Sequence, residues 1–256
     1  MINNILAELR KSLGRKYTYM YFGGIILLIL LANTAVIAFR LIYGANEGTY
    51  ANNILEYATW CFVIPYYTCI LIAGIGFGKE YPNPHIKDGH TSSLSKTEIY
   101  LSKLIVSLVL GAIFLIVAAI ALLAITGIFQ LGDGLANWYS ISDFLIKMCI
   151  AMPLWYAGVS IGIMFLFLFE KRAVAVISYL VLTLVIPRVI MFFAAEPFKI
   201  VFFRLIRTYT ITQNFSLIPY PADPSRNVSL TIALGLIYGT LATVIGCISF
   251  NKKKFK

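Results

Sequence analysis

Apolar residues along this chain fall into six long runs, separated by short polar stretches. The runs cover residues 19–43, 57–78, 99–129, 144–169, 173–193 and 229–250. Each run has the length of about 20 residues that a helix needs to cross the hydrocarbon core of a bilayer. The pattern therefore predicts an all-α integral membrane protein in one domain, residues 1–256, with six transmembrane helices and both ends of the chain on the same side.

The first residues follow a different pattern. Apolar residues recur there at helical spacing on one face, with Glu8 and several basic residues on the rest. The apolar positions are Ile2, Ile5, Leu6, Leu9 and Leu13. This pattern predicts an N-terminal interfacial elbow helix over residues 2–14, lying against membrane lipid. An ordinary amphipathic helix packed on a partner is the alternative.

The segment between the fifth and sixth runs, residues 194–228, is the longest polar interval. It contains the stretch FKIVFFRLIR, in which Lys199, Arg204 and Arg207 fall on one side of a helix and apolar residues on the other. Loops of this length without structure of their own are uncommon. We therefore expect a short interfacial or re-entrant helix before the last span.

Composition and charge agree with a membrane protein. The chain is 60% hydrophobic and 12% charged, with mean hydropathy +0.84, whereas soluble domains are about 45–50% apolar and about 25% charged. Fourteen of its 21 Lys and Arg residues lie in segments that six spans place on the side of the termini. Since cytoplasmic segments collect positive charge, we expect a multi-pass protein of the cell membrane with cytoplasmic termini. The net charge of +10 then attracts lipid headgroups and requires no nucleic acid as partner.

Glycines and prolines inside the runs carry packing information. Gly158 and Gly162, and again Gly235 and Gly239, have the four-residue spacing that lets two helices approach closely. We interpret both pairs first as packing within one subunit and second as a seam between two subunits. Prolines at 65, 153 and 187 predict kinks.

The stretch GIGFGKEYPNPHIKDGH, residues 74–90, resembles a phosphate-binding loop at first sight. Such a loop needs G-x-x-x-x-G-K-[ST] between a strand and a helix. Here Ala73 stands at the first glycine, Glu80 stands at the Ser or Thr, and a membrane helix precedes them. The stretch is therefore no nucleotide site, and its glycines indicate close packing at the end of the second span.

The residues that follow predict two helix starts. Asn83 is a good N-cap, Pro84 suits the first helical position and Gly89 suits the end, so residues 85–88 form one short helix. Residues 95–98, Ser-Lys-Thr-Glu, form a capping box that opens the third span. A short helix between two spans is typical of a docking feature.

At this point the chain resembles a known family. The run KEYPNPHIKDGHTSSLSKTEIYLSKLIVSL, residues 79–108, is similar to the cytoplasmic signature of ABC-2-type transporter permeases. The matching residues are Glu80, Tyr81, Asn83, Ile86, Lys87, Gly89, Ser95, Lys96, Ile99, Tyr100 and Lys103. The elbow, six spans, the long outer segment and the Lys-rich tail agree with that family along the whole chain. Pro82 and Pro84 depart from its helix-friendly pattern.

The resemblance implies that this chain is the transmembrane subunit of an ABC exporter, nearest to small permeases that export bacteriocins, bacitracin-like antibiotics and other amphipathic peptides. Residues 79–98 then form a cytoplasmic coupling segment that contacts an ATP-binding-cassette ATPase. The residues implied in ATPase coupling are Glu80, Tyr81, Asn83, His85, Ile86, Lys87, Asp88 and Gly89. ATP and Mg²⁺ belong to that partner, so we expect no cofactor and no enzymatic activity in this chain. A second permease subunit, identical or homologous, completes the assembly.

An amphipathic peptide needs a largely apolar path through the spans. Tyrosines in the second, fourth and fifth runs are the candidate lining residues, although aromatic residues at helical spacing more often pack. They are Tyr66, Tyr67, Tyr156 and Tyr179.

Three other functions remain as alternatives. An ion-coupled transporter needs ionisable groups near the middle of the membrane, whereas all eleven acidic residues lie in loops or near span ends. A metal-dependent enzyme would use His85, Asp88, His90 and Glu80, but this spacing crosses a glycine in a short loop, so we expect no metal. A peptide-sensing or immunity protein that does not transport is separated from an exporter by transport assays alone.

Overall fold

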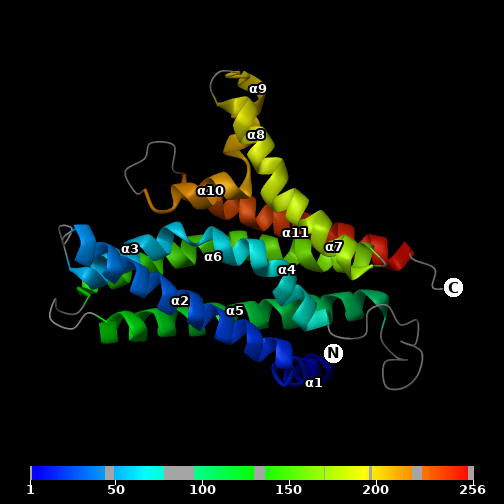
Figure 1. Ribbon diagram of the computed structural model, residues 1–256. Helices are drawn as coiled ribbons and strands as arrows, with labels where there is room; N and C mark the ends of the chain where they lie inside the picture. Colours follow the sequence, from blue (N-terminus) through cyan, green and yellow to red (C-terminus); the bar gives the residue numbers. More distant parts are fainter. Residues whose placement is uncertain are drawn as a thin grey trace.

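The computed structural model describes residues 2–43, 49–77, 95–129, 136–169, 171–195, 198–220 and 227–252, and the regular structure in these ranges is helical (Figure 1). The helices are α1 (Ile2–Leu13), α2 (Lys16–Tyr43), α3 (Tyr50–Trp60), α4 (Val63–Phe77), α5 (Lys96–Phe129), α6 (Trp138–Leu168), α7 (Arg172–Leu180), η2 (Val181–Val185), α8 (Ile186–Ala194), α9 (Val201–Thr208), α10 (Ile211–Leu217) and α11 (Val228–Lys252).

Five helical segments in the described ranges are long and apolar enough to cross a membrane: α2, α5, α6, the continuous stretch Arg172–Ala194, and α11. The bent pair α3 and α4 makes a sixth when it is counted as one span. This confirms the predicted class, an all-α membrane protein.

The second apolar run differs from the single helix expected over residues 57–78. The axes of α3 and α4 make an angle of 59° at Cys61 and Phe62. Pro65 has no backbone N–H, so the carbonyl of Cys61 cannot receive the usual helical hydrogen bond from it. Ile64 N donates to that carbonyl instead, at 2.9 Å. This hydrogen bond closes a tight turn, and the turn interrupts the helix of the second span.

The fifth span also contains a local irregularity. A π-helical turn, η2, lies between α7 and α8, and Pro187 is the second residue of α8. Pro187 cannot donate to the carbonyl four residues earlier, which is that of Thr183. The buried Thr183 hydroxyl donates to Tyr179 O at 2.8 Å. The expected proline kink therefore takes the form of a widened turn.

The most densely packed part of the molecule consists of α4, α6 and α11. A Cβ atom added at Gly158 would lie 2.8 Å from the ring of Tyr66 on α4, and one at Gly235 would lie 2.4 Å from the backbone of Pro153 on α6. Gly162 and Gly239 make similar close contacts with α4 and α6. Both glycine pairs therefore pack helices within one subunit, as the first interpretation predicts.

Helix α1 lies across the bundle at the end where α11 also finishes (Figure 1). Ile5, Leu9 and Leu13 pack against a cluster of buried residues from α4 and α5: Ile72, Ile75, Val106, Leu110 and Phe114. Leu6 points away and is 54% exposed, while the side chain of Ile2 lies outside the described part. The apolar face thus covers the chain's own bundle, and its position at the membrane interface stays a prediction.

The outer segment contains two short helices where one was expected. Helices α8 and α9 project from the bundle, whereas α10 turns back alongside α11 (Figure 1). On α9, Val201, Phe202 and Leu205 are 76%, 64% and 60% exposed, while Ile211 and Phe215 of α10 are buried. The two helices therefore have different neighbours: α10 belongs to the core and α9 does not.

Candidate functional site

The candidate site is the end of the bundle from which residues 78–94 leave. That segment lies outside the described residues, and with it lie all the predicted coupling residues: Glu80, Tyr81, Asn83, His85, Ile86, Lys87, Asp88 and Gly89. His90 lies there too, so the metal-site alternative is also outside the description. Within the described ranges no three His, Cys, Asp or Glu side chains come together as a metal site. The structure describes the helix ends on either side of this segment, namely the end of α4 and the start of α5. We call these two ends, with the side chains that hold them, the frame.

The end of α4 is held by two arginines from other elements. The guanidinium of Arg15, between α1 and α2, donates to Ile75 O, and Arg172 Nη2, at the start of α7, donates to Gly74 O at 2.5 Å. Carbonyls in the last turn of a helix have no partner within it and carry the negative end of the helix dipole. The two cations therefore fix the exit of α4 and connect it to α1, α2 and α7.

Glycines at the end of α4 make these contacts possible. A Cβ at Gly74 would lie 2.8 Å from Arg172 Nη2, and one at Gly76 would lie 2.2 Å from Ser107 Oγ on α5. The expectation that the glycine run serves close packing is confirmed at both positions.

The start of α5 is held in two ways. Ser95 N donates to Glu98 Oε2 at 2.8 Å and Glu98 N donates to Ser95 Oγ at 3.3 Å, which confirms the predicted capping box. Asn251, at the end of α11, donates from Nδ2 to Thr97 Oγ1 at 3.0 Å and accepts on its carbonyl from Lys96 Nζ at 3.3 Å. The entry to α5 is thereby connected to the last span.

An ion pair joins α1 to α5 beside this frame. Lys103 Nζ lies 2.8 Å from Glu8 Oε2, with side chains 9% and 22% exposed. In this partly buried position the two charges attract each other more strongly than in water, while their lost hydration offsets part of that gain. This pairing could not be predicted from the sequence, because 95 positions separate Glu8 from Lys103. The available signal was that Glu8 is a lone acidic residue on a basic helix.

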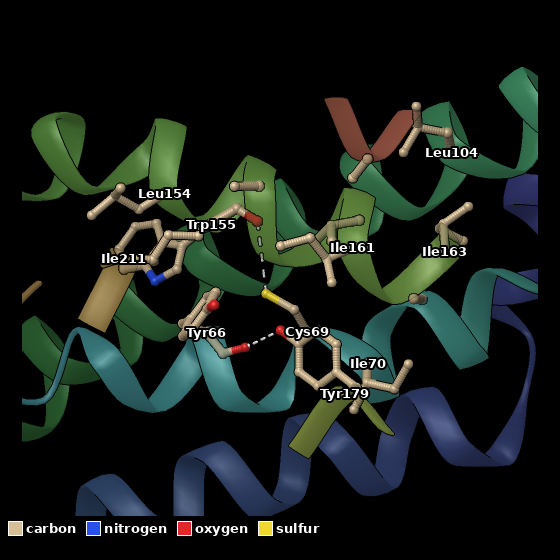
Figure 2. Packing of buried hydrophobic residues seen from close by; sticks show 14 of the residues in the cluster. Tyr66, Cys69, Ile70, Leu104, Leu154, Trp155, Ile161, Ile163, Tyr179 and Ile211 are labelled. Carbon is tan, nitrogen blue, oxygen red and sulfur yellow. Dashed lines mark hydrogen bonds between the residues drawn. The ribbon is translucent and has the colours of Figure 1, made fainter. Parts of the chain in front are cut away.

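The four candidate tyrosines of the substrate path lie in different surroundings. Tyr66 and Tyr179 are 3% and 0% exposed, and Tyr179 OH donates to Tyr66 O at 2.5 Å (Figure 2). Tyr156 is half-buried and fills the space above Gly239 of α11. Tyr67 is half-buried and borders a pocket beside α10. The structure therefore does not bring the four together, and three of them pack helices; their place in a substrate path stays a prediction.

Cys69 lies at the centre of this packing. Figure 2 shows its thiol between α4 and α6, with Sγ 3.8 Å from Trp155 O. Trp155 Nε1 donates to Phe62 O at 2.9 Å, at the break between α3 and α4. The bend in the second span is therefore supported by a buried side chain of α6.

Comparison with known proteins adds one finding. A family model described as ABC-2 family transporter protein matches residues 4–188, from α1 into α8. No curated protein matches the chain. The match covers residues 78–94 together with Arg15, Arg172 and the start of α5, and it ends before α9, so Asn251 of α11 lies outside it.

Proposed function

The chain belongs to the ABC-2 family of transporter proteins, and from that premise we propose that it is the membrane subunit of an exporter of amphipathic peptides, peptide antibiotics among them. Membership makes it a membrane transport subunit of an ABC transporter rather than the ATPase, and implies association with an ATP-binding-cassette ATPase. The outward direction, the peptide substrate and a second permease subunit, identical or homologous, are parts of the proposal.

In this proposal residues 79–98 contact the ATPase in the cytoplasm, on the same side as both termini. The observation that carries it is the frame: the exit of α4 is bonded to Arg15 and Arg172, and the entry of α5 to Asn251. A displacement of the segment between them is thereby delivered to α2, α7 and α11 together. Motion of the partner on ATP binding can then reach several spans at once.

The distribution of charge supports an ATP-driven mechanism over an ion-coupled one. Among the described spans, the acidic residues are the exposed Glu56 of α3, in the bent pair, and Glu98 and Asp143 near the starts of α5 and α6, and Asp143 pairs with Lys147 at 2.6 Å. Ion-coupled transport needs such groups near the membrane midplane. Spans that are mostly apolar suit a substrate that is itself partly apolar.

The test is co-expression with a candidate ATP-binding-cassette ATPase from the same organism. Ile86→Asp and Lys87→Glu are expected to abolish co-purification of the two subunits and ATP-driven efflux of peptide, because each places a repelling charge in the proposed contact. Peptides that are substrates should raise ATP hydrolysis by the intact complex.

Arg204→Glu is the matched control, since it reverses a charge on the exposed helix α9, far along the chain from the coupling segment. It should leave complex formation unchanged. Normal assembly and efflux in the Ile86 and Lys87 variants would refute the coupling role, and a complex that binds peptide without moving it would favour the sensing alternative.

A further inference from the structure

A pocket lies where the break between α3 and α4 faces α9 and α10. Its volume is about 470 Å³, within the range of small-molecule sites, roughly 300–1,000 Å³. Trp60 and Tyr67 contribute from the side of the break, Arg207 from α9, and Gln213, Phe215 and Tyr220 from α10 and the residues after it. Two irregular parts of the chain thus enclose it together.

The aromatic part of the pocket is open to the surroundings. The rings of Trp60 and Tyr220 meet edge to face with centroids 4.7 Å apart, and they are 51% and 43% exposed. Phe215 is 2% exposed and closes the site from below. Large exposed rings around a recess favour the apolar portion of a ligand.

The polar part of the pocket has one sign of charge. Arg207 Nε donates to Gln213 Oε1 at 2.8 Å, which fixes the plane of the guanidinium. Its terminal nitrogens have no hydrogen bond or ion pair with the described residues, and the described lining contains no Asp or Glu. A fixed guanidinium with free donors is suited to a carboxylate or a phosphate.

The walls of the pocket are held in place before any ligand arrives. Thr231 Oγ1 of α11 donates to Asn214 Oδ1 of α10 at 3.0 Å, and Asn214 Nδ2 donates to Thr208 O at 3.0 Å. The opposite wall is supported by the hydrogen bond from Trp155 to Phe62 O. Binding then costs little ordering of the protein.

From this geometry we infer that the pocket binds an anionic amphiphile, with its phosphate or carboxylate on Arg207 and its apolar portion against the paired rings of Trp60 and Tyr220. The inference does not rest on the proposed export of peptides. The anion can belong to a membrane lipid or to a soluble molecule, and the experiment separates the two sources.

The experiment uses the purified full chain in an uncharged detergent, with Trp60 emission measured as the difference between the chain and its Trp60→Phe variant. Lysophosphatidylglycerol is the probe, lysophosphatidylcholine of the same acyl length is the zwitterionic control, and inorganic phosphate is the soluble anion. We expect a saturable change with the anionic probe and an affinity weaker by about tenfold or more for the zwitterionic one. Competition by inorganic phosphate would assign the site to soluble anions, and its absence would assign it to lipid.

Three variants complete the test. Arg207→Gln should weaken binding of the anionic probe by about tenfold or more, while Arg207→Lys should keep most of it. Arg204→Gln removes the same charge from the same helix outside the pocket and should change nothing. Equal affinity in Arg207→Gln and Arg204→Gln, or no saturable change at Trp60, would overturn the inference. Should Arg207→Gln fail to fold, the Arg207→Lys variant and the comparison of the two lysolipids decide.

Discussion

Two regions of this molecule bury their apolar residues to very different degrees. In α6, at the centre of the group formed by α4, α6 and α11, 67% of the most apolar stretch is buried inside the chain. In the segment Arg172–Ala194, which with α9 forms a projecting arm, the value is 17% although the stretch is equally fit to span a membrane (Figure 1). The fraction of a helix that is buried within this protein is therefore independent of whether the helix is long enough to span a membrane.

The difference follows from the solvent. Lipid is as apolar as leucine, so an apolar helix gains little by leaving it for a neighbouring helix. Close packing then depends on small residues and specific hydrogen bonds, and α6 and α11 have the glycines that permit it. The arm contacts the bundle chiefly near its start, through Arg172 and Tyr179. Substitutions should therefore be most harmful in the packed group, intermediate at these two contacts, and mild on the arm.

The largest effect is expected for Gly235→Ala. The new methyl group would lie 2.4 Å from the backbone carbon of Pro153, and backbone cannot move aside as a side chain can. Overpacking typically costs about 1–3 kcal/mol, and we expect a loss of about 3 kcal/mol here because the obstacle is backbone. The measurement is the free energy of unfolding in mixed micelles.

Gly127→Ala is the matched control, because nothing lies within 4 Å of the added Cβ atom. It should be neutral or stabilising by up to about 1 kcal/mol, since alanine is the better helix former. Similar losses at the two glycines would mean that α6 and α11 do not pack as closely as described.

Part of this picture could be predicted from the sequence. Apolar runs predicted an all-α membrane protein, the capping box at Ser95 placed the start of α5, and the spacing of Gly158 and Gly162 indicated a close helix contact. Each of these signals is local: the residues that make it lie within a few turns of one another.

What could not be predicted depends on partners far apart in the chain. Arg15 and Arg172 reach α4 across 60 and 98 positions, and no periodicity records such a pairing. The break after Trp60 was missed because Pro65 alone predicts a kink, whereas the 59° bend also uses Trp155 of another helix. The coupling residues from Glu80 to Gly89 lie outside the described part, so their role stays a prediction.

A second, smaller effect is expected where the arm meets the packed group. Tyr179→Phe removes the hydroxyl that donates to Tyr66 O but keeps the ring that fills the core. The loss should be about 1 kcal/mol, since interhelical hydrogen bonds in membranes average about 0.6 kcal/mol and buried ones are worth somewhat more. The same substitution at Tyr57, whose side chain is 43% exposed, should cost less than half as much; equal costs would show that the hydrogen bond adds nothing.

A third effect concerns the other contact of the arm. Arg172→Met removes the guanidinium from Gly74 O at the end of α4, and a cation at a helix C-terminus contributes about 0.3–1 kcal/mol. We expect a loss of that size in the free energy of unfolding. Added salt should lower the stability of the unmodified chain, so that the difference between the two chains becomes smaller. Lys171→Met removes the neighbouring exposed charge and is the control; a loss as large there would indicate a general effect of charge.

The smallest effect is expected on the arm itself. Phe202 of α9 is 64% exposed, and its ring contacts the ring of its neighbour Phe203. Phe202→Ser should therefore change the free energy of unfolding by no more than about 0.5 kcal/mol. The same substitution at Phe215 of α10, which is 2% exposed and contacts the rings of Tyr66 and Trp155, should cost about 3 kcal/mol or more. Comparable losses at the two phenylalanines would mean that α9 packs on the chain as α10 does. The distinction between the arm and the packed group would then be wrong.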